Sequence, residues 1–250
     1  MTANPFERHG LAHLSASQLN LYRASPALWV VEYLLKVRGS VGVAAYCGTA
    51  VEAGVAAGLL DPALAVEDCT AIAQKRYREL TMLSGDAKRD EKGAEIPGMV
   101  GHALEALRPY GVPSATQQRI EVRLDDVAVP VIGFKDFSFD AHGLDVDLKT
   151  SARLPSQMSQ EHRVQGAIYF SASGNREQRF CYATKAKGTV YRLEEPHEAL
   201  AQARRIALAM SRLLALSADA AEIAGLLVPD YSQFRWSAET RAAGRDLYGI

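Results

Sequence analysis

The sequence predicts an α/β protein in which helices flank a central mixed β-sheet, preceded by an N-terminal helical elaboration. Apolar residues at helix-compatible spacing dominate residues 1–112. Alternating strand patterns begin near Gln117 and continue to Thr150, and helical spacing returns after them. The 250 residues contain no repeat, low-complexity tract or long linker, so we expect one domain spanning residues 1–250.

The mainly helical part, residues 1–112, divides at caps, prolines and glycines. Ser15 or Ser17 can cap a first helix that Pro26 interrupts or restarts, and apolar spacing continues to Val37. An Ala/Gly-rich helix is expected within 41–60. A polar helix is expected over 67–82, with Ile72, Tyr77 and Leu80 on its inner face. A charged loop over 84–93 and a further helix over 97–110 follow it.

Residues 113–195 are expected to hold the sheet and one helix. The stretches 117–126, 127–140 and 143–150 alternate as strands, and the turn residues between the last two favour a meander. A helix is expected from Pro155 to about Ala172, followed by a hairpin over 177–194. The C-terminal part, residues 196–250, is expected to form a helix to about Leu216 and then a tail.

The charge balance narrows the function classes. Lys and Arg total 28 against 29 Asp and Glu, a formal charge of −1. This excludes a histone-like protein or a polycationic DNA coat, because such binding needs many excess cations. A localised basic groove is still compatible with the total, since net charge averages over all faces.

The cysteines and the first residues indicate a cytoplasmic protein. Cys47, Cys69 and Cys181 are widely spaced and form no C-x-x-C pair, which fits neither a disulfide framework nor a zinc knuckle. Residues 1–9 lack the basic and apolar regions of a signal peptide.

Residues 41–60 imitate a membrane span and contain a G-x-x-x-G at Gly54 and Gly58. The segment is Ala/Gly-rich, and Glu52 at its centre would cost about 2.5 kcal/mol or more in lipid. We therefore expect a closely packed helix inside the protein and no membrane partner. A carboxylate in so apolar a helix needs a cation or a hydrogen-bond donor as its partner.

Charged residues gather on two neighbouring predicted strands. Alternation places Asp145, Asp147 and Lys149 on one face of the strand over 144–150, and Asp136 lies in the strand before it. If the strands pair, Asp136 and Asp147 can converge, and two close carboxylates are hard to keep ionised without a cation. Mg²⁺ or Mn²⁺ suits such oxygen ligands, and the Lys149 ammonium could hold a phosphate oxygen or an activated water. A sheet with one solvated side is the alternative interpretation.

The helix after these strands adds a polar face. His162, Gln165 and Tyr169 are spaced i, i+3 and i+7. His162 could reach a phosphate or the surroundings of the metal. Tyr169 could equally be a core aromatic and Gln165 a surface residue.

Together these motifs resemble the PD-(D/E)XK nucleases, and within them the RecB-like branch of phage and bacterial exonucleases. The family pattern is an acidic or His residue on an early helix after a Gly, then Asp, then (D/E)-x-K, then Q-x-x-x-Y. The matching segments, in the same order and spacing, are Gly48–Glu52, Gly133–Asp136, Asp147–Thr150 and Gln165–Tyr169. The resemblance covers roughly residues 15–193.

The resemblance implies a restriction-endonuclease-like core, αβββαβ, and a role for each matched residue. Glu52, Asp136 and Asp147 would bind Mg²⁺ or Mn²⁺, and Lys149 would position the attacking water. The residues expected to contact substrate or brace the site are Gln165, Tyr169, His162, Thr150 and Arg153. Relatives with an iron–sulfur cluster carry Cys where Ser25 stands, and a four-Cys cluster needs four thiolates. We therefore expect no cluster.

The expected function is that of a divalent-metal-dependent DNA nuclease, an exonuclease acting in DNA repair, recombination or phage DNA processing. Basic residues of the sheet region could hold single- or double-stranded DNA by its phosphates, largely independently of sequence: Arg119, Arg123, Lys135, Arg153, Arg163, Lys185, Lys187 and Arg192. No nucleotide-binding G-x-x-x-x-G-K-[ST] loop is present, so a recombination or helicase protein could be a separate partner. The alternative is a catalytically inactive nucleic-acid-binding or scaffold protein that retains the fold.

Overall fold

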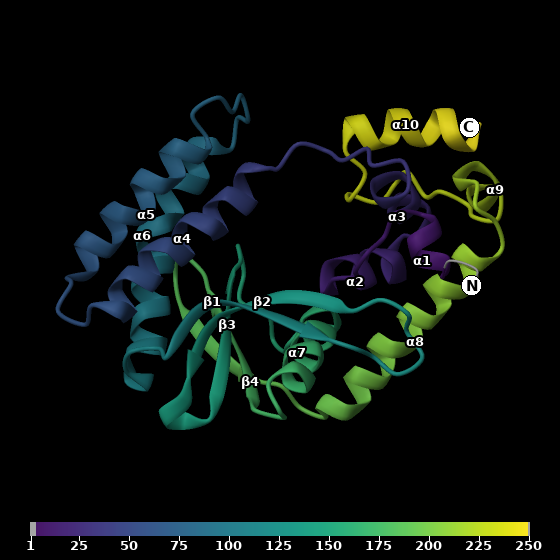
Figure 1. The fold of residues 1–250 in the computed structure, drawn as a ribbon. Helices are drawn as coiled ribbons and strands as arrows, with labels where there is room; N and C mark the ends of the chain where they lie inside the picture. Colours follow the sequence, from purple (N-terminus) through teal and green to yellow (C-terminus); the bar gives the residue numbers. More distant parts are fainter. Residues whose placement is uncertain (1–3, 250) are drawn as a thin grey trace.

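A five-stranded mixed sheet forms the centre of the computed structural model, which describes residues 4–249 (Figure 1). The strands are β1 (Ala115–Val122), β2 (Val131–Phe139), β3 (Leu144–Thr150), β4 (Glu177–Ala183) and β5 (Gly188–Arg192), and they lie in that order across the sheet. All neighbours are antiparallel except β3 and β4, which run parallel because a helical crossover joins them. The α/β class, the mixed sheet, the meander and the final hairpin are confirmed.

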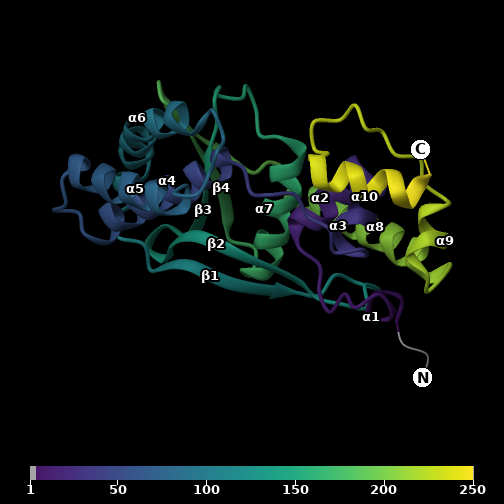
Figure 2. The same cartoon turned by 90° about the horizontal axis from the view of Figure 1, so that it is seen from above.

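Helices cover both faces of this sheet (Figures 1 and 2). On one side lie α4 (Val43–Leu60), α5 (Val66–Leu80) and α6 (Arg89–Leu107), and on the other lie α7 (Gln160–Ala172) and α8 (Pro196–Ala215). The remaining helices pack beside α8: α1 (Pro5–Arg8), α2 (Ala16–Ala24), α3 (Pro26–Tyr33), α9 (Ala220–Ala224) and α10 (Ala238–Tyr248). Short 3₁₀ turns occupy Arg108–Tyr110 and Asp140–His142.

Two hydrophobic clusters follow these layers. The alternating apolar residues of β3, which are Leu144, Val146 and Leu148, pack under α4–α6 together with Phe137 and Phe139 of β2. On the other side, Val164, Ile168 and Tyr169 of α7 pack against α8 and the start of β2. The face of β3 opposite to Leu148 therefore turns toward α7, and that face carries the charged residues.

The small residues of α4 allow it to pack closely inside the protein. A Cβ at Gly54 would lie 2.5 Å from the Cys69 carbonyl oxygen, and one at Gly58 would lie 2.5 Å from Cys69 Sγ, both on α5. By length and composition α4 could cross a membrane, with a mean hydropathy of 1.5, but 44% of it is buried in the protein. The Ala/Gly-rich sequence is thus explained by close helix packing.

Several predicted helix boundaries were wrong. The helix starting at Pro26 ends at Tyr33 instead of Val37, and Lys36 takes a positive φ of 59°. In α5 the buried residues are Cys69, Ala73 and Tyr77, whereas Ile72 is exposed, because the inner stripe is set by the small residues that face α4.

The expected loop over 84–93 is shorter than predicted. Helix α6 begins at Arg89 and runs through Pro97, so the proline lies inside the helix instead of starting it. Proline removes one helical hydrogen bond, and burial of Ile96, Met99 and Val100 beside it offsets that loss.

The start of α7 and the C-terminal tail also differ from expectation. Ser159 caps α7 with its side chain, so the helix starts at Gln160 instead of Pro155, and residues 151–159 form a connection. The tail contains α9 and α10, which its sparse apolar pattern did not predict. A capping box at Ser237 and Thr240 starts α10.

Candidate active site

Asp136 occupies a fork between two strands of the sheet. The β2–β3 ladder runs from Phe139↔Leu144 to Phe137↔Val146, and the strands separate beyond that pair. There the Leu148 backbone N–H donates to Asp136 Oδ2 at 2.8 Å instead of to a strand partner. The carboxylate is thereby fixed beside β3 by the backbone itself.

Asp147 and Lys149 point from β3 into the same region. Lys149 Nζ lies 2.5 Å from Asp147 Oδ2, and Gln165 Nε2 donates to Asp147 Oδ1 at 2.8 Å. The same Gln165 amide donates to the Tyr169 hydroxyl at 3.0 Å. The face of α7 expected to line the site therefore holds the second carboxylate.

Glu52 reaches this cluster from α4 through a residue that the sequence did not reveal. Gln117 on β1 donates through Nε2 to Glu52 Oε1 and, at 3.0 Å, to Asp136 Oδ1. In the β1–β2 register Gln117 stands opposite Asp136, and its φ is +48°, which is rare for a residue with a side chain. The connection between these two strands has no predictable register, so no sequence signal placed Gln117 at the site.

The three carboxyl groups of the cluster are electrostatically unfavourable in the absence of a cation. Burial, followed by the charges of Asp147 and Glu52, raises the pKa of Asp136 well above its ordinary value. Burial also raises the pKa of Asp147 and of Glu52. For Lys149, burial lowers the pKa, but attraction to Asp147, Asp136 and Glu52 outweighs that effect and raises it. The cluster thus favours an ammonium ion and opposes three free carboxylates.

The chemistry of this donor set fits a hard divalent cation. Asp136 and Asp147 are buried, with 9% and 4% of their surface exposed, and Asp147 Oδ2 accepts no hydrogen bond despite its ion pair with Lys149. All-oxygen sites of this kind suit Mg²⁺ or Mn²⁺. The residues that would hold such an ion are Asp136, Asp147 and Glu52.

No three His, Cys, Asp or Glu side chains within residues 4–249 converge as a ready-made metal site. The contacts of the cluster supply the reason. The Gln117 amide lies between Glu52 and Asp136, and the Lys149 ammonium forms an ion pair with one oxygen of Asp147. These donors satisfy the carboxylates that a cation would otherwise bring together.

Beside the cluster lies a cleft of about 590 Å³ between α2, β2 and α7, and among the described residues that line it the cluster contributes Lys149 but none of its three carboxylates. Lys149, His162, Gln165 and Tyr169 line it, together with Phe134, whose side chain is 51% exposed although it is large and apolar. The remaining lining residues are His13, Ser15, Ala16, Ser17, Asn20, Leu21, Ile132, Gly133, Glu161 and Arg235.

His162 lies in the cleft as a neutral ring. Its Nδ1 shares a hydrogen bond of 2.5 Å with the Tyr182 hydroxyl, and the ring stacks on Phe180. Burial, followed by the charge of Lys149, lowers the pKa of His162 to about 4. The ring can therefore accept or donate a hydrogen bond at neutral pH but carries no positive charge for a phosphate.

Other predicted substrate contacts lie outside the cleft. The Thr150 side chain lies close to Gly48 of α4: a Cβ added to Gly48 would be 3.2 Å from Thr150 Oγ1. Arg153 is exposed on the connection before α7 and is not among the described residues that line the cleft.

The basic residues of the sheet region are mostly engaged elsewhere. Lys135 is buried and pairs with Asp145 at 3.0 Å, which the Gln178 amide also contacts, so Lys135 does not face substrate as expected. Arg119 pairs with Glu121 at 2.8 Å and Arg192 with Glu177 at 3.2 Å. Asp145, predicted to share a face with Asp147, thus belongs to a separate buried ion pair.

The fold agrees with what comparison with known proteins shows. Residues 13–243 match the family model described as the PD-(D/E)XK nuclease superfamily. The chain therefore belongs to that superfamily.

No curated protein sequence matches the chain. Ten solved chains match it, among them one titled "Crystal structure of SSO0001", with 17% identity and a TM-score of 0.34 over 64% of this chain and 84% of that one.

Proposed function

We propose that the chain is a divalent-metal-dependent deoxyribonuclease that hydrolyses phosphodiester bonds. The observation that carries this proposal is the buried Asp136–Asp147–Lys149 cluster, joined by Glu52, with Lys149 lining the adjacent cleft. Its residues belong to a chain of the PD-(D/E)XK nuclease superfamily. Mg²⁺ or Mn²⁺ held by the carboxylates would neutralise the scissile phosphate and acidify the attacking water.

The residues of the site would bind the substrate and position the carboxylates. The Lys149 ammonium lies at the mouth of the cluster, where it can hold a phosphate oxygen or orient the water. Gln165 fixes Asp147 through one oxygen, and Tyr169 holds Gln165. Asp136 is oriented by the Leu148 N–H through Oδ2 and by the Gln117 amide through Oδ1.

Phe134 supports a nucleic acid as the substrate. A half-exposed phenyl ring beside a charged cleft offers a platform for a base, since base–aromatic stacking is tolerant of sequence. Together with phosphate contacts, this gives binding with little base specificity. We extend the proposal to action on DNA ends in cytoplasmic DNA repair, recombination or phage DNA processing, because the motif set resembles that of RecB-like exonucleases.

The proposal is tested with purified protein and linear DNA in Mn²⁺, in Mg²⁺ and in EDTA. We expect cleavage of single- or double-stranded DNA with either metal and none in EDTA. Intact DNA in all conditions, combined with tight binding, would instead support the inactive nucleic-acid-binding alternative. A preference for ends predicts that closed circular DNA survives while the same DNA, once linearised, is degraded.

A further inference from the structure

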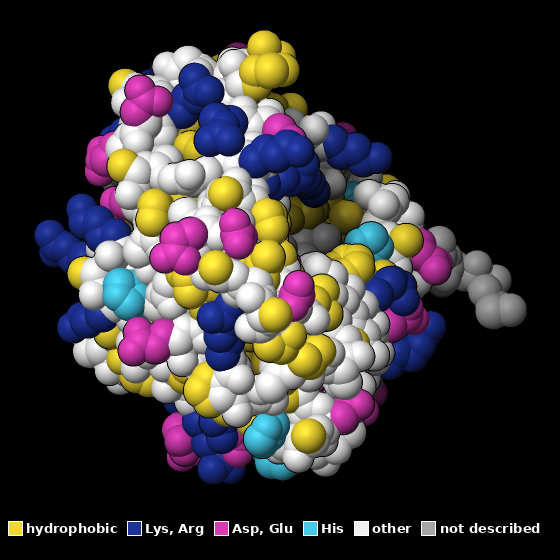
Figure 3. Space-filling model, turned by 90° about the vertical axis from the view of Figure 1, so that its left-hand side faces the viewer, with side chains coloured by type: hydrophobic (Ala, Val, Ile, Leu, Met, Phe, Trp, Pro, Cys, Tyr) yellow, Lys and Arg dark blue, Asp and Glu magenta, His cyan; other side chains and the backbone are white. Residues whose placement is uncertain are grey.

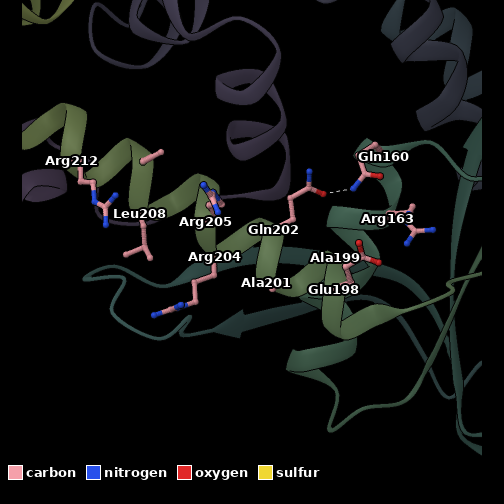
Figure 4. A pocket seen from close by; sticks show the side chains of 11 residues that line it. Gln160, Arg163, Glu198, Ala199, Ala201, Gln202, Arg204, Arg205, Leu208 and Arg212 are labelled. Carbon is pink, nitrogen blue, oxygen red and sulfur yellow. Dashed lines mark hydrogen bonds between the residues drawn. The ribbon is translucent and has the colours of Figure 1, made fainter.

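A second hollow, along the outer face of α8, is larger than the catalytic cleft. It has a volume of about 990 Å³ and we name it the α8 groove (Figure 4). Its lining residues are Gln160, Arg163, Glu198, Ala199, Ala201, Gln202, Arg204, Arg205, Leu208, Ala209 and Arg212. Four of these are arginines and one is acidic, which is a local excess of positive charge in a chain whose net charge is −1.

Two of the four arginines are free to take a ligand. Arg204 pairs with Asp126, and Arg163 lies 3.5 Å from Glu195. Arg205 and Arg212 are exposed and have no ion-pair partner within residues 4–249. They are seven residues apart on the helix, which separates their backbones by about 10 Å along its axis.

The α8 groove and the cleft beside the catalytic cluster lie on either side of the first turn of α7. Gln160 and Arg163 line the groove, whereas Glu161 and His162 line the cleft. Figure 4 shows Gln160 reaching Gln202 of α8, with Arg205 and Arg212 further along the same helix. A strand that leaves the cleft over this turn therefore reaches the arginines of α8.

We propose that the α8 groove binds the phosphate backbone of the DNA strand beyond the scissile bond. This inference rests on the proposed nuclease function and adds a binding site to it. Arginine suits the role because its planar guanidinium binds two phosphate oxygens at once. Ala209 lies between Arg205 and Arg212 and is small, so a backbone can approach the helix closely there.

The test measures how removing the charge of the groove affects the binding and cleavage of short and long DNA strands. Arg205→Gln/Arg212→Gln is measured for binding in Ca²⁺, a non-catalytic ion, and for cleavage in Mn²⁺, using strands of about 6 and about 30 nucleotides. We expect about tenfold weaker binding of the long strand and unchanged binding and cleavage of the short one. Loss of two phosphate contacts also lowers the slope of log K against log salt by about 1.4 for single strands.

Two matched variants separate a site from a general charge effect. Lys75→Gln/Arg78→Gln removes the same charge from exposed positions of α5, on a side of the molecule where acidic, basic and apolar side chains are mixed (Figure 3). It should leave long-strand binding intact. Arg205→Lys/Arg212→Lys keeps the charge and should keep the salt slope.

Three results would overturn the inference: equal losses in the α8 and α5 variants, equal losses on short and long strands, or no loss in the α8 variant. The last result would point to an acidic protein as the occupant of the groove. Failure of the nuclease proposal is distinguishable, because the wild type would then leave even short strands uncut.

Discussion

At the scale of single residues, Asp136 bears the largest electrostatic cost of the site. Burial and two neighbouring carboxylates raise its pKa, so the metal-free folded protein binds this proton more tightly than the unfolded chain does. That contribution to stability is complete below the ordinary value of 3.8 and is lost as the pH rises through the raised value. The carboxyl group of Asp136 therefore stabilises the metal-free fold less as the pH rises toward neutral.

Replacing Asp136 by Asn should stabilise the metal-free protein at pH 7 while abolishing cleavage. The amide oxygen still accepts the Leu148 N–H, and the unfavourable charge is gone, which outweighs the loss of the hydrogen bond from the Gln117 amide. We expect a rise of about 2–4 °C in Tm, which is the shift that about 1 kcal/mol produces in a chain of this length. Thermal unfolding in EDTA measures this, and the gain should vanish near pH 3.

Asp145→Asn is the matched control and should have the opposite effect. Asp145 is as buried as the catalytic carboxylates but is the ion-pair partner of Lys135, at 3.0 Å. Its removal leaves a buried ammonium uncompensated, which costs about 3–5 kcal/mol. If both Asn variants shift Tm in the same direction, the distinction between a functional and a structural carboxylate is wrong.

Gln117 is expected to hold Glu52 and Asp136 in place. Gln117→Ala removes one amide that donates to both carboxylates, so we expect metal-free stability to fall by about 1 kcal/mol. Because this amide no longer lies where a cation would join the two carboxylates, we expect the Mn²⁺ affinity to rise several-fold. Gln118→Ala, at the next position on β1, should change neither. Calorimetric titration with Mn²⁺ compares the two variants. Equal effects would show that the change comes from perturbing β1 and not from losing the Gln117 amide.

The candidate cluster shows which residues a sequence can reveal. Asp136, Asp147 and Lys149 could be predicted because strand alternation and pairing act over a few residues. Gln117 could not, because its place depends on the register of β1 across an irregular connection. Lys135 was misplaced for a similar reason: its charge suggested exposure, and only the packing of β2 on α7 shows the buried pair with Asp145.

At the scale of elements, α6 tests how closely the helical layer packs on the sheet. A Cβ at Gly98 would lie 2.3 Å from the Lys185 carbonyl oxygen, in the turn between β4 and β5. Gly98→Ala should therefore destabilise the protein by about 1–3 kcal/mol. Chemical denaturation measures the change in unfolding free energy.

Gly101→Ala on the same helix is the control for this substitution. Its Cβ would meet only Val66 Cγ1 at 3.9 Å, an ordinary contact. Because alanine favours a helix over glycine, we expect a gain of up to about 1 kcal/mol. A destabilising Gly101→Ala, or a neutral Gly98→Ala, would contradict the packing described for α6.

Element boundaries were less predictable than element types. The strands and the hairpin were evident from their alternation, but Pro97 was taken as a helix start because proline favours the first turn. Burial of α6 residues on both sides of Pro97 overrides that local preference. The tail helices α9 and α10 are held by packing against α3 and by the Ser237 cap, and neither produces a strong periodic pattern.

At the scale of the whole molecule, metal binding should be visible as a change in stability. A cation that binds only the folded state adds about 2.7 kcal/mol at 100 times its Kd. Because protons compete for Asp136, whose pKa is raised, this stabilisation should shrink as the pH falls from neutral toward acid. Thermal unfolding with and without Mn²⁺ across pH checks it, and a pH-independent shift would place the ion elsewhere.

The near-neutral net charge conceals local groups of acidic and basic residues. A formal charge of −1 includes Glu52, Asp136 and Asp147, which a divalent ion would neutralise, while arginines concentrate along α8. Attraction of DNA is thus expected to be local, and to depend on divalent ions and salt.

The most direct test of the central claim is the single-turnover cleavage rate of Lys149→Ala on linear DNA in Mn²⁺. Lys75→Ala, at an exposed position of α5, serves as the control. The account predicts a loss of about 10²–10³-fold for Lys149→Ala, with DNA binding retained, and no loss for the control. Cleavage by Lys149→Ala at the wild-type rate would contradict the assignment of this cluster as the catalytic centre.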